Sequence, residues 1–180
     1  MDAAVYIVTG FLESGKTKFM REMLTDEGFS EGERTLLLVC EEGEEEYEPE
    51  LLKKYNTVMV NIESPEDMAG DKLIQLDKKY RPERVLIEYN ATWLLSTLYS
   101  AKKPENWELA QIITLIDATT FELYLKNMRQ YMADGIQEGD LIIFNRCSDD
   151  TPKSKWRRAA LAMNNTARIF FEHPDGGMDD

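Results

Sequence analysis

Hydrophobic residues fall into short continuous runs, separated by longer stretches in which apolar residues recur every three or four positions. A run that is apolar at every position is typical of a strand buried on both sides of a mostly parallel sheet. The predicted strands are 4–9, 35–40, 57–62, 85–89, 112–116, 141–144 and 167–171.

Amphipathic patterns between these runs predict helices. We expect one helix from Ser64 to Tyr80, because Ser64 fits an N-cap and Pro65 fits the first helical position. The other patterns cover 16–24 and 121–132, and a further one begins at 151. Strand and helix alternate along the whole chain. This alternation predicts an α/β fold, a doubly wound and mostly parallel sheet with helices on both faces.

Residues 10–17, GFLESGKT, fit the pattern G-x-x-x-x-G-K-[ST] between the first strand and the first helix. Such a loop points backbone N–H groups at phosphate, and the helix dipole adds positive charge. Lys16 would reach the β- and γ-phosphates, and the Thr17 hydroxyl would bind Mg²⁺. The alternative is a glycine-containing turn with an exposed lysine, but the flanking strand and helix favour the phosphate site.

Polar residues follow the other predicted strands, whose carboxyl ends meet at the edge where ligands bind in such sheets. Residues 41–50 include seven glutamates and are either part of the site or a solvated acidic loop. Glu88 is a functional or a capped structural acid, and Asp117 is a site acid or closes its strand. Asn145 contacts a nucleotide base or belongs to a turn.

The formal net charge of −13 argues against a nucleic-acid partner or an anionic membrane surface. No apolar run approaches the roughly 18 residues that span a bilayer, so membrane insertion is not expected. The start of the chain lacks a basic segment typical of signal peptides. Cys40 and Cys147 do not form a C-x-x-C pair and are expected as free thiols. Together these features predict a cytoplasmic protein.

The stretches TGFLESGKT, CEEGEEEYE, VLIEYNA, ITLIDATTF and FNRCSDD resemble the CobW/HypB/UreG family of P-loop GTPases, and within it the CobW-like branch. That branch typically reads GFLGSGKTT, then N-E-F-G-E with a later acid, a strand ending E-x-x-G, and an N-K-x-D element. The resemblance spans about residues 4–171. It implies a P-loop nucleotide-binding domain over 1–172, followed at 173–180 by a polar tail or the start of a truncated linker.

The resemblance also implies roles for the acids. Glu41, Gly43 and Glu44 match the switch element, and Glu48 falls where the family has its later acid. Glu88 matches the acid that positions Mg²⁺ or the attacking water. The catalytic residues predicted in this way are Lys16, Glu88 and Glu44, and the predicted metal ligands are Thr17, Glu41 and Glu88.

On the base side, Asn145 matches the asparagine that contacts guanine, and Asn164 resembles an asparagine of a later element near the base. The residues predicted to contact the nucleotide are Gly10, Glu13, Ser14, Gly15, Lys16, Thr17, Lys18, Asn145, Arg146 and Asn164.

Several positions depart from the family pattern. Ala91 replaces the glycine of E-x-x-G, and Ser148 replaces the aspartate that reads guanine, with Asp149 one residue later. Arg146 replaces the lysine of N-K-x-D. The C-x-C-C metal motif is absent, because residues 57–84 contain no cysteine.

The sequence therefore predicts Mg²⁺-dependent binding and hydrolysis of GTP, or ATP, in a CobW-like and metallochaperone-like protein. The resemblance implies metal-cofactor delivery or assembly as the role, with a protein client or a missing C-terminal domain as partner. Ala91 and the altered base element favour an alternative, a nucleotide-binding regulatory module that does not hydrolyse. A small-molecule kinase is a third option, which the acidic run at 41–50 disfavours.

Overall fold

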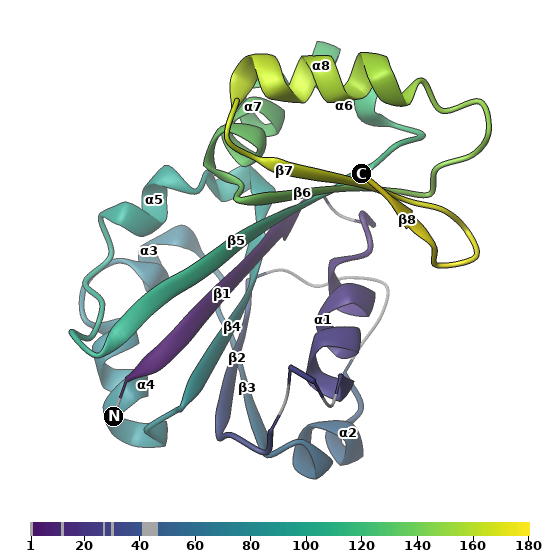
Figure 1. Ribbon diagram of the computed structural model, residues 1–180. Helices are drawn as coiled ribbons and strands as arrows, with labels where there is room; N and C mark the ends of the chain where they lie inside the picture. The colour runs from purple at the N-terminus through teal and green to yellow at the C-terminus, as the bar shows by residue number, and fades with distance from the viewer. Residues whose placement is uncertain (1, 12, 27, 30, 41–46) are drawn as a thin grey trace.

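The computed structural model describes residues 2–11, 13–26, 28–29, 31–40 and 47–180. Its sheet has eight strands in the order β3-β2-β4-β1-β5-β6-β7-β8, and every neighbouring pair is parallel except β7 and β8 (Figure 1). The strands are β1 Ala3–Gly10, β2 Thr35–Val39, β3 Thr57–Asn61, β4 Arg84–Asn90, β5 Trp107–Asp117, β6 Leu141–Asn145, β7 Arg168–Glu172 and β8 Met178–Asp179. The predicted α/β fold class is confirmed.

The helices are α1 Lys16–Thr25, α2 Pro49–Lys54, α3 Pro65–Met68, α4 Lys72–Tyr80, α5 Ser96–Tyr99, α6 Phe121–Asn127, α7 Arg129–Glu138 and α8 Lys153–Met163, with a 3₁₀ turn η1 at Ala91–Trp93. The prediction of one helix from Ser64 to Tyr80 was wrong. The chain breaks at Gly70, whose φ of +66° does not belong to a right-handed helix. The 121–132 pattern is likewise divided, at Met128 (φ −134°, ψ 45°).

Helices cover both faces of the sheet. In β2, Leu36 and Leu38 pack with α4 on one face, while Leu37 and Val39 pack with α1 and α2 on the other. Farther along the sheet, α7 and α8 pack on the same face as α4. Ile112 and Ile116 point to one face of β5, and Ile112 packs in the cluster that contains α4, while Ile116 packs in the cluster that contains α7 and α8. Burial from both sides explains why inner strands such as β2 and β4 are continuous apolar runs.

Parallel pairing brings the strand ends to one edge. β1 ends at Gly10, which lies opposite Asn90 at the end of β4, and Asp117 of β5 lies opposite Asn145 of β6. In Figure 1 this edge is at the upper end of β1. The loop that leads from β1 to α1 therefore begins beside the ends of its neighbours.

The polar C-terminal stretch turns back on the sheet. β8 pairs antiparallel with β7, with Phe171 opposite Asp179. Asp179 contacts His173 at 2.7 Å and Lys153 of α8 at 2.5 Å. Among the described residues, the helices are too short or too polar to cross a membrane.

Candidate functional site

The loop between β1 and α1 depends on its two glycines. A Cβ on Gly10 would lie 2.5 Å from Ser14 Oγ and 2.6 Å from the Leu115 carbonyl oxygen, which is closer than atoms can approach. Gly15 precedes α1 with a φ of +91°, a conformation that costs glycine little. The loop is thus a tight turn that leads directly into the helix N-terminus.

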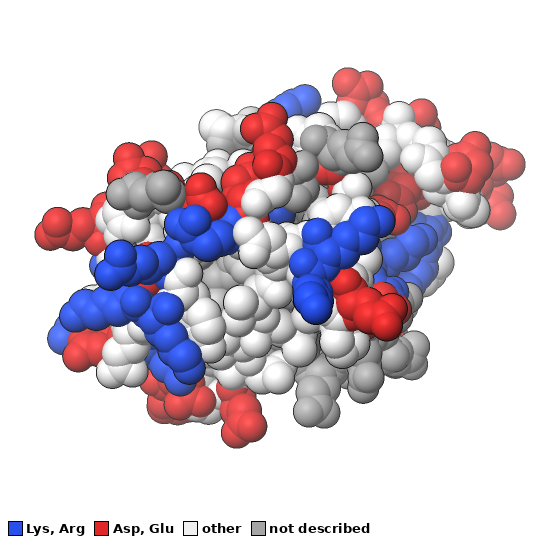
Figure 2. Space-filling model, turned by 90° about the horizontal axis from the view of Figure 1, so that it is seen from below, with Lys and Arg blue, Asp and Glu red and all other residues white. Residues whose placement is uncertain are grey.

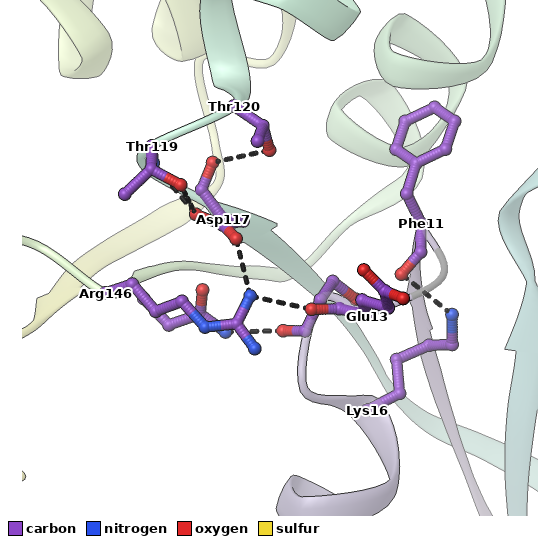
Figure 3. Close-up of polar contacts among 9 residues, drawn as sticks. Phe11, Glu13, Lys16, Asp117, Thr119, Thr120 and Arg146 are labelled. Carbon is purple, nitrogen blue, oxygen red and sulfur yellow. Dashed lines mark hydrogen bonds and ion pairs between the residues drawn. The ribbon is translucent and has the colours of Figure 1, made fainter. Parts of the chain in front are cut away.

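Lys16 is folded against this loop. Its side chain is 4% exposed, and its ammonium donates to the carbonyl oxygens of Gly10 and Phe11, the latter at 3.2 Å (Figure 3). Burying an ammonium is costly unless hydrogen bonds compensate, and the two carbonyls supply that compensation. The loop therefore holds a positive charge at its own centre, in a protein with a net charge of −13.

Thr17, in the first turn of α1, is joined to the end of β4. Its hydroxyl donates to Glu88 Oε1 at 2.7 Å, and Glu88 is only 1% exposed. A threonine that donates its hydrogen to a carboxylate keeps its oxygen lone pairs for a cation. Carboxylate and hydroxyl oxygens are ligands that Mg²⁺ accepts, so this pair fits the ion that the family implies.

Tyr47 also contacts Glu88, and sequence reasoning missed it. Its phenol donates to Glu88 Oε2, and the residue is 8% exposed. Burial, and next the charge of Glu88, raise the pKa of Tyr47 well above its usual value, so the phenol keeps its proton and acts as a donor. A sequence signal existed, because Tyr47 is the one aromatic residue within the acidic stretch 41–50.

The end of β6 supports the loop from the other side. Asn145 donates from Nδ2 to the Ser14 carbonyl, and Arg146 donates to the Glu13 carbonyl at 2.7 Å. Arg146 also pairs with Asp117 at the end of β5 (Figure 3). Arg146 and Glu13 both have positive φ, +55° and +67°. The Glu13 side chain is exposed, and Arg146 contacts the backbone carbonyl of this residue.

Asp117 is held as a carboxylate. Burial raises its pKa, but hydrogen bonds from Thr119 and the Arg146 guanidinium outweigh that effect, so the net pKa lies below its usual value. Thr119 donates to Asp117 from its backbone N–H at 2.8 Å and from its hydroxyl. Asp117 therefore closes its strand and also anchors Arg146 beside the loop.

Two buried polar atoms at the loop have unused hydrogen-bonding capacity. Ser14 Oγ and Asn145 Oδ1 make no hydrogen bond to any described residue. Buried polar atoms are seldom left in this state, so their presence beside the glycine turn fits a site that receives a polar ligand. Lys18, which is exposed, lines a small pocket of about 90 Å³ with Gly15 and Asn145.

The prediction that Asn164 lies near the base was wrong. Helix α8 starts after β6 and runs back along the sheet, which carries Asn164 to the edge where β6 begins. There its amide donates to the carbonyl oxygens of Ile136 at 3.0 Å and Gly139 at 2.8 Å. Asn164 therefore joins α8 to the end of α7.

The positions that depart from the family pattern have local roles. Ser148 accepts a hydrogen bond from the Asp150 N–H at 3.2 Å, and its own N–H donates to Thr151, so it organises the turn before α8. Ala91 is buried at the start of η1. Glu41, Gly43 and Glu44 lie outside the described residues, and so their predicted roles stay predictions. Within the described part of the chain, no three His, Cys, Asp or Glu residues are grouped closely enough to hold a metal ion.

Comparison with known proteins gives a consistent assignment. The model of the CobW/HypB/UreG nucleotide-binding domain matches residues 4–171. The Zn(II)-bound YjiA GTPase from E. coli has a TM-score of 0.72 at 20% identity, covering 99% of this chain and 60% of that one. The hydrogenase maturation factor HypB from Archaeoglobus fulgidus has a TM-score of 0.64 at 14% identity, with coverages of 98% and 83%. HypB from Helicobacter pylori in complex with nickel has a TM-score of 0.60 at 13% identity, with coverages of 95% and 79%.

At these identities the solved structures establish the fold, and this chain spans about 60% of the length of YjiA. No curated protein matches the sequence.

Proposed function

The chain belongs to the CobW/HypB/UreG family of nucleotide-binding domains, and from that premise we propose that it binds GTP with Mg²⁺ and hydrolyses it. One observation carries the proposal. The glycine turn holds the buried Lys16 ammonium at its centre, and the next residue, Thr17, already donates to Glu88. A turn without a ligand role would not need to bury a lysine at this cost.

In this proposal each residue of the site has a physical task. Lys16 and the loop N–H groups offset the charge of the β- and γ-phosphates. Thr17 and Glu88 hold Mg²⁺, which, when bound, neutralises charge that develops on the transferring phosphoryl group. Glu88, with Glu44 as the second candidate, orients the attacking water, while Glu41 is a further candidate for the ion. Catalysis of this kind is mostly positioning and electrostatic stabilisation.

Asn145 and Arg146 support the loop from the base side, and Glu13, Ser14 and Lys18 complete the predicted contacts with the nucleotide. Ser148 offers no carboxylate to the guanine N–H groups, and its hydroxyl is engaged in the turn before α8. We therefore expect a weaker preference for GTP over ATP than a guanine-reading aspartate would give.

The test is a thermal-unfolding series with GTP, ATP, GDP and ADP, each with and without Mg²⁺. We expect triphosphates with Mg²⁺ to raise the unfolding temperature by several degrees, since a ligand at about 100 times its Kd adds about 2.7 kcal/mol to stability. Lys16→Ala should abolish that rise, judged against the unfolding temperature of the same variant without nucleotide. A wild-type protein that responds to none of the nucleotides would contradict the proposal.

Release of phosphate separates hydrolysis from binding alone. Mg²⁺-dependent release that Lys16→Ala abolishes would support an enzyme. Stabilisation without release would support a regulatory nucleotide-binding module, which the engagement of Ser148 and the alanine at position 91 favour. For the biological role we propose metal-cofactor delivery or assembly with a protein client. That proposal rests on the family and would be tested by nucleotide-dependent binding of Zn²⁺ or Ni²⁺.

A further inference from the structure

Both oxygens of the Glu88 carboxylate accept hydrogen bonds. Thr17 of α1 donates to Oε1 at 2.7 Å, and Tyr47, which lies just before α2, donates to Oε2. All three residues are 8% exposed or less. Two donors from different elements leave a carboxylate little freedom to rotate, so the direction of Glu88 is set before any ligand arrives.

The position of the Tyr47 hydroxyl is fixed by packing. Its ring belongs to the apolar cluster between the sheet and α1, together with Met20, Leu24 and Leu52. The next residue, Glu48, precedes α2 and pairs with Arg21 of α1, the helix that begins with Lys16 and Thr17. The ring of Tyr47 is thus held by the core beside α1, and its neighbour Glu48 is tied to the same helix.

The simpler interpretation is that Tyr47 has a structural role alone, since a buried phenol needs a hydrogen-bond acceptor. Tyr89, on the same strand as Glu88, has such a structural role. It is buried, and its hydroxyl donates to the Leu94 carbonyl at 2.9 Å. Tyr47 differs because its acceptor is the carboxylate that also receives the Thr17 hydroxyl, so its bond bears directly on the predicted Mg²⁺ ligands.

We propose that Tyr47 is a positioning residue that holds the Glu88 carboxylate in the orientation that Mg²⁺ binding requires. It acts through Glu88 and does not itself contact the nucleotide. The proposal rests on the proposed function. It predicts that loss of this one hydroxyl weakens the use of Mg²⁺ while contacts with the rest of the nucleotide remain, because partners of metal ligands orient those ligands.

The test compares Tyr47→Phe with Tyr89→Phe, since each variant keeps its ring and loses one buried, hydrogen-bonded hydroxyl. Mg²⁺ is titrated against the thermal stabilisation given by a non-hydrolysable GTP analogue, a readout that needs no turnover. We expect Tyr47→Phe to need about tenfold more Mg²⁺ for half of the effect, and Tyr89→Phe to match the wild type. In phosphate release, kcat should fall about tenfold with little change in KM for the nucleotide.

A double-mutant cycle tests whether Tyr47 acts through the Glu88 carboxylate. In a Glu88→Gln background, Tyr47→Phe should cause no further change in Mg²⁺ requirement, because Tyr47 acts through the carboxylate. Equal Mg²⁺ requirements for wild type and Tyr47→Phe would overturn this proposal alone, and so would an undiminished effect of Tyr47→Phe without the Glu88 carboxylate. A wild type that does not respond to the analogue at any Mg²⁺ concentration would overturn the proposed function, and this proposal with it.

Discussion

The Arg146 guanidinium joins the phosphate loop to β5, because it donates to the Glu13 carbonyl and pairs with Asp117. Asp117→Asn should lower the free energy of unfolding by about 1 kcal/mol at pH 7, because the ion pair is lost. Since the pKa of Asp117 is lower in the folded protein, its contribution is complete above the unfolded value of about 4. It disappears as the pH falls through the folded value. Urea unfolding at pH 7 and below pH 4 measures this difference.

Asp149→Asn is the matched control, because Asp149 is exposed and lies in the same segment as Arg146. It should follow the wild type at both pH values. A gap between Asp117→Asn and the wild type that persists unchanged at acid pH would show that the carboxylate charge is not what stabilises the loop.

Some residues of the site could be predicted from the sequence and others could not. Lys16, Thr17 and Glu88 were located from the motif and from the ends of apolar runs, and the structure brings them together. Tyr47 could not be found in this way, because it belongs neither to the motif nor to the end of an apolar run. The prediction for Asn164 was wrong because α8 carries this residue along the length of a strand to the opposite edge of the sheet, which a motif match does not reveal.

The turn between β1 and α1 has no room for a side chain at Gly10, whereas the turn between α3 and α4 has room at Gly70. Gly10→Ala places a methyl group within 2.6 Å of two neighbouring atoms, one of them a backbone carbonyl oxygen. It should cost about 1–3 kcal/mol of stability and abolish the thermal response to nucleotide. Gly70→Ala, in the turn between α3 and α4, meets no atom within 4 Å and pays only for its positive φ, about 1 kcal/mol.

Guanidinium unfolding of both variants, with nucleotide titrations, distinguishes the two causes. Gly70→Ala should keep the nucleotide response of the wild type. If Gly10→Ala also kept it, the close approach of Gly10 to Ser14 and Leu115 would not be what shapes the loop.

Elements were predictable where burial dictates the pattern. All seven predicted strands exist. Burial on both faces explains the continuous apolar runs of the inner strands, while the edge strand β3 is apolar although Val58 and Met59 are exposed. The first half of β5, residues 107–111, mixes polar and apolar residues and was missed. The ends of the helices were harder to predict from the sequence. An apolar period continues through Gly70 and Met128, where backbone angles outside the helical region end one helix before the next begins.

The two ends of the strands carry different charged groups. Figure 2 views the side on which the central strands begin, where Lys and Arg, with Asp and Glu among them, surround an uncharged surface. A groove of about 440 Å³ at this end is lined by Arg34, which lies just before β2, and by Asp77, Lys78 and Arg81 at the end of α4. The opposite end of the strands carries the Lys16 ammonium together with the carboxylates of Glu88 and Asp117. Phosphates would therefore approach an edge where the Lys16 ammonium and the loop N–H groups offset two nearby carboxylates.

The net charge of −13 predicts how salt affects stability. With 34 acids and 21 basic residues, repulsion among unmatched acids outweighs the attraction of surface ion pairs, which contribute little individually. Raising NaCl from about 0.01 M to about 0.15 M shortens the screening length from about 30 Å to about 8 Å, so the unfolding temperature without nucleotide should rise. Lys16→Ala should show the same rise, since the effect belongs to the whole charge distribution. A rise confined to the wild type would point to anion binding at the loop, and a fall would mean that ion pairs such as Arg21–Glu48 and Lys155–Glu122 outweigh the repulsion.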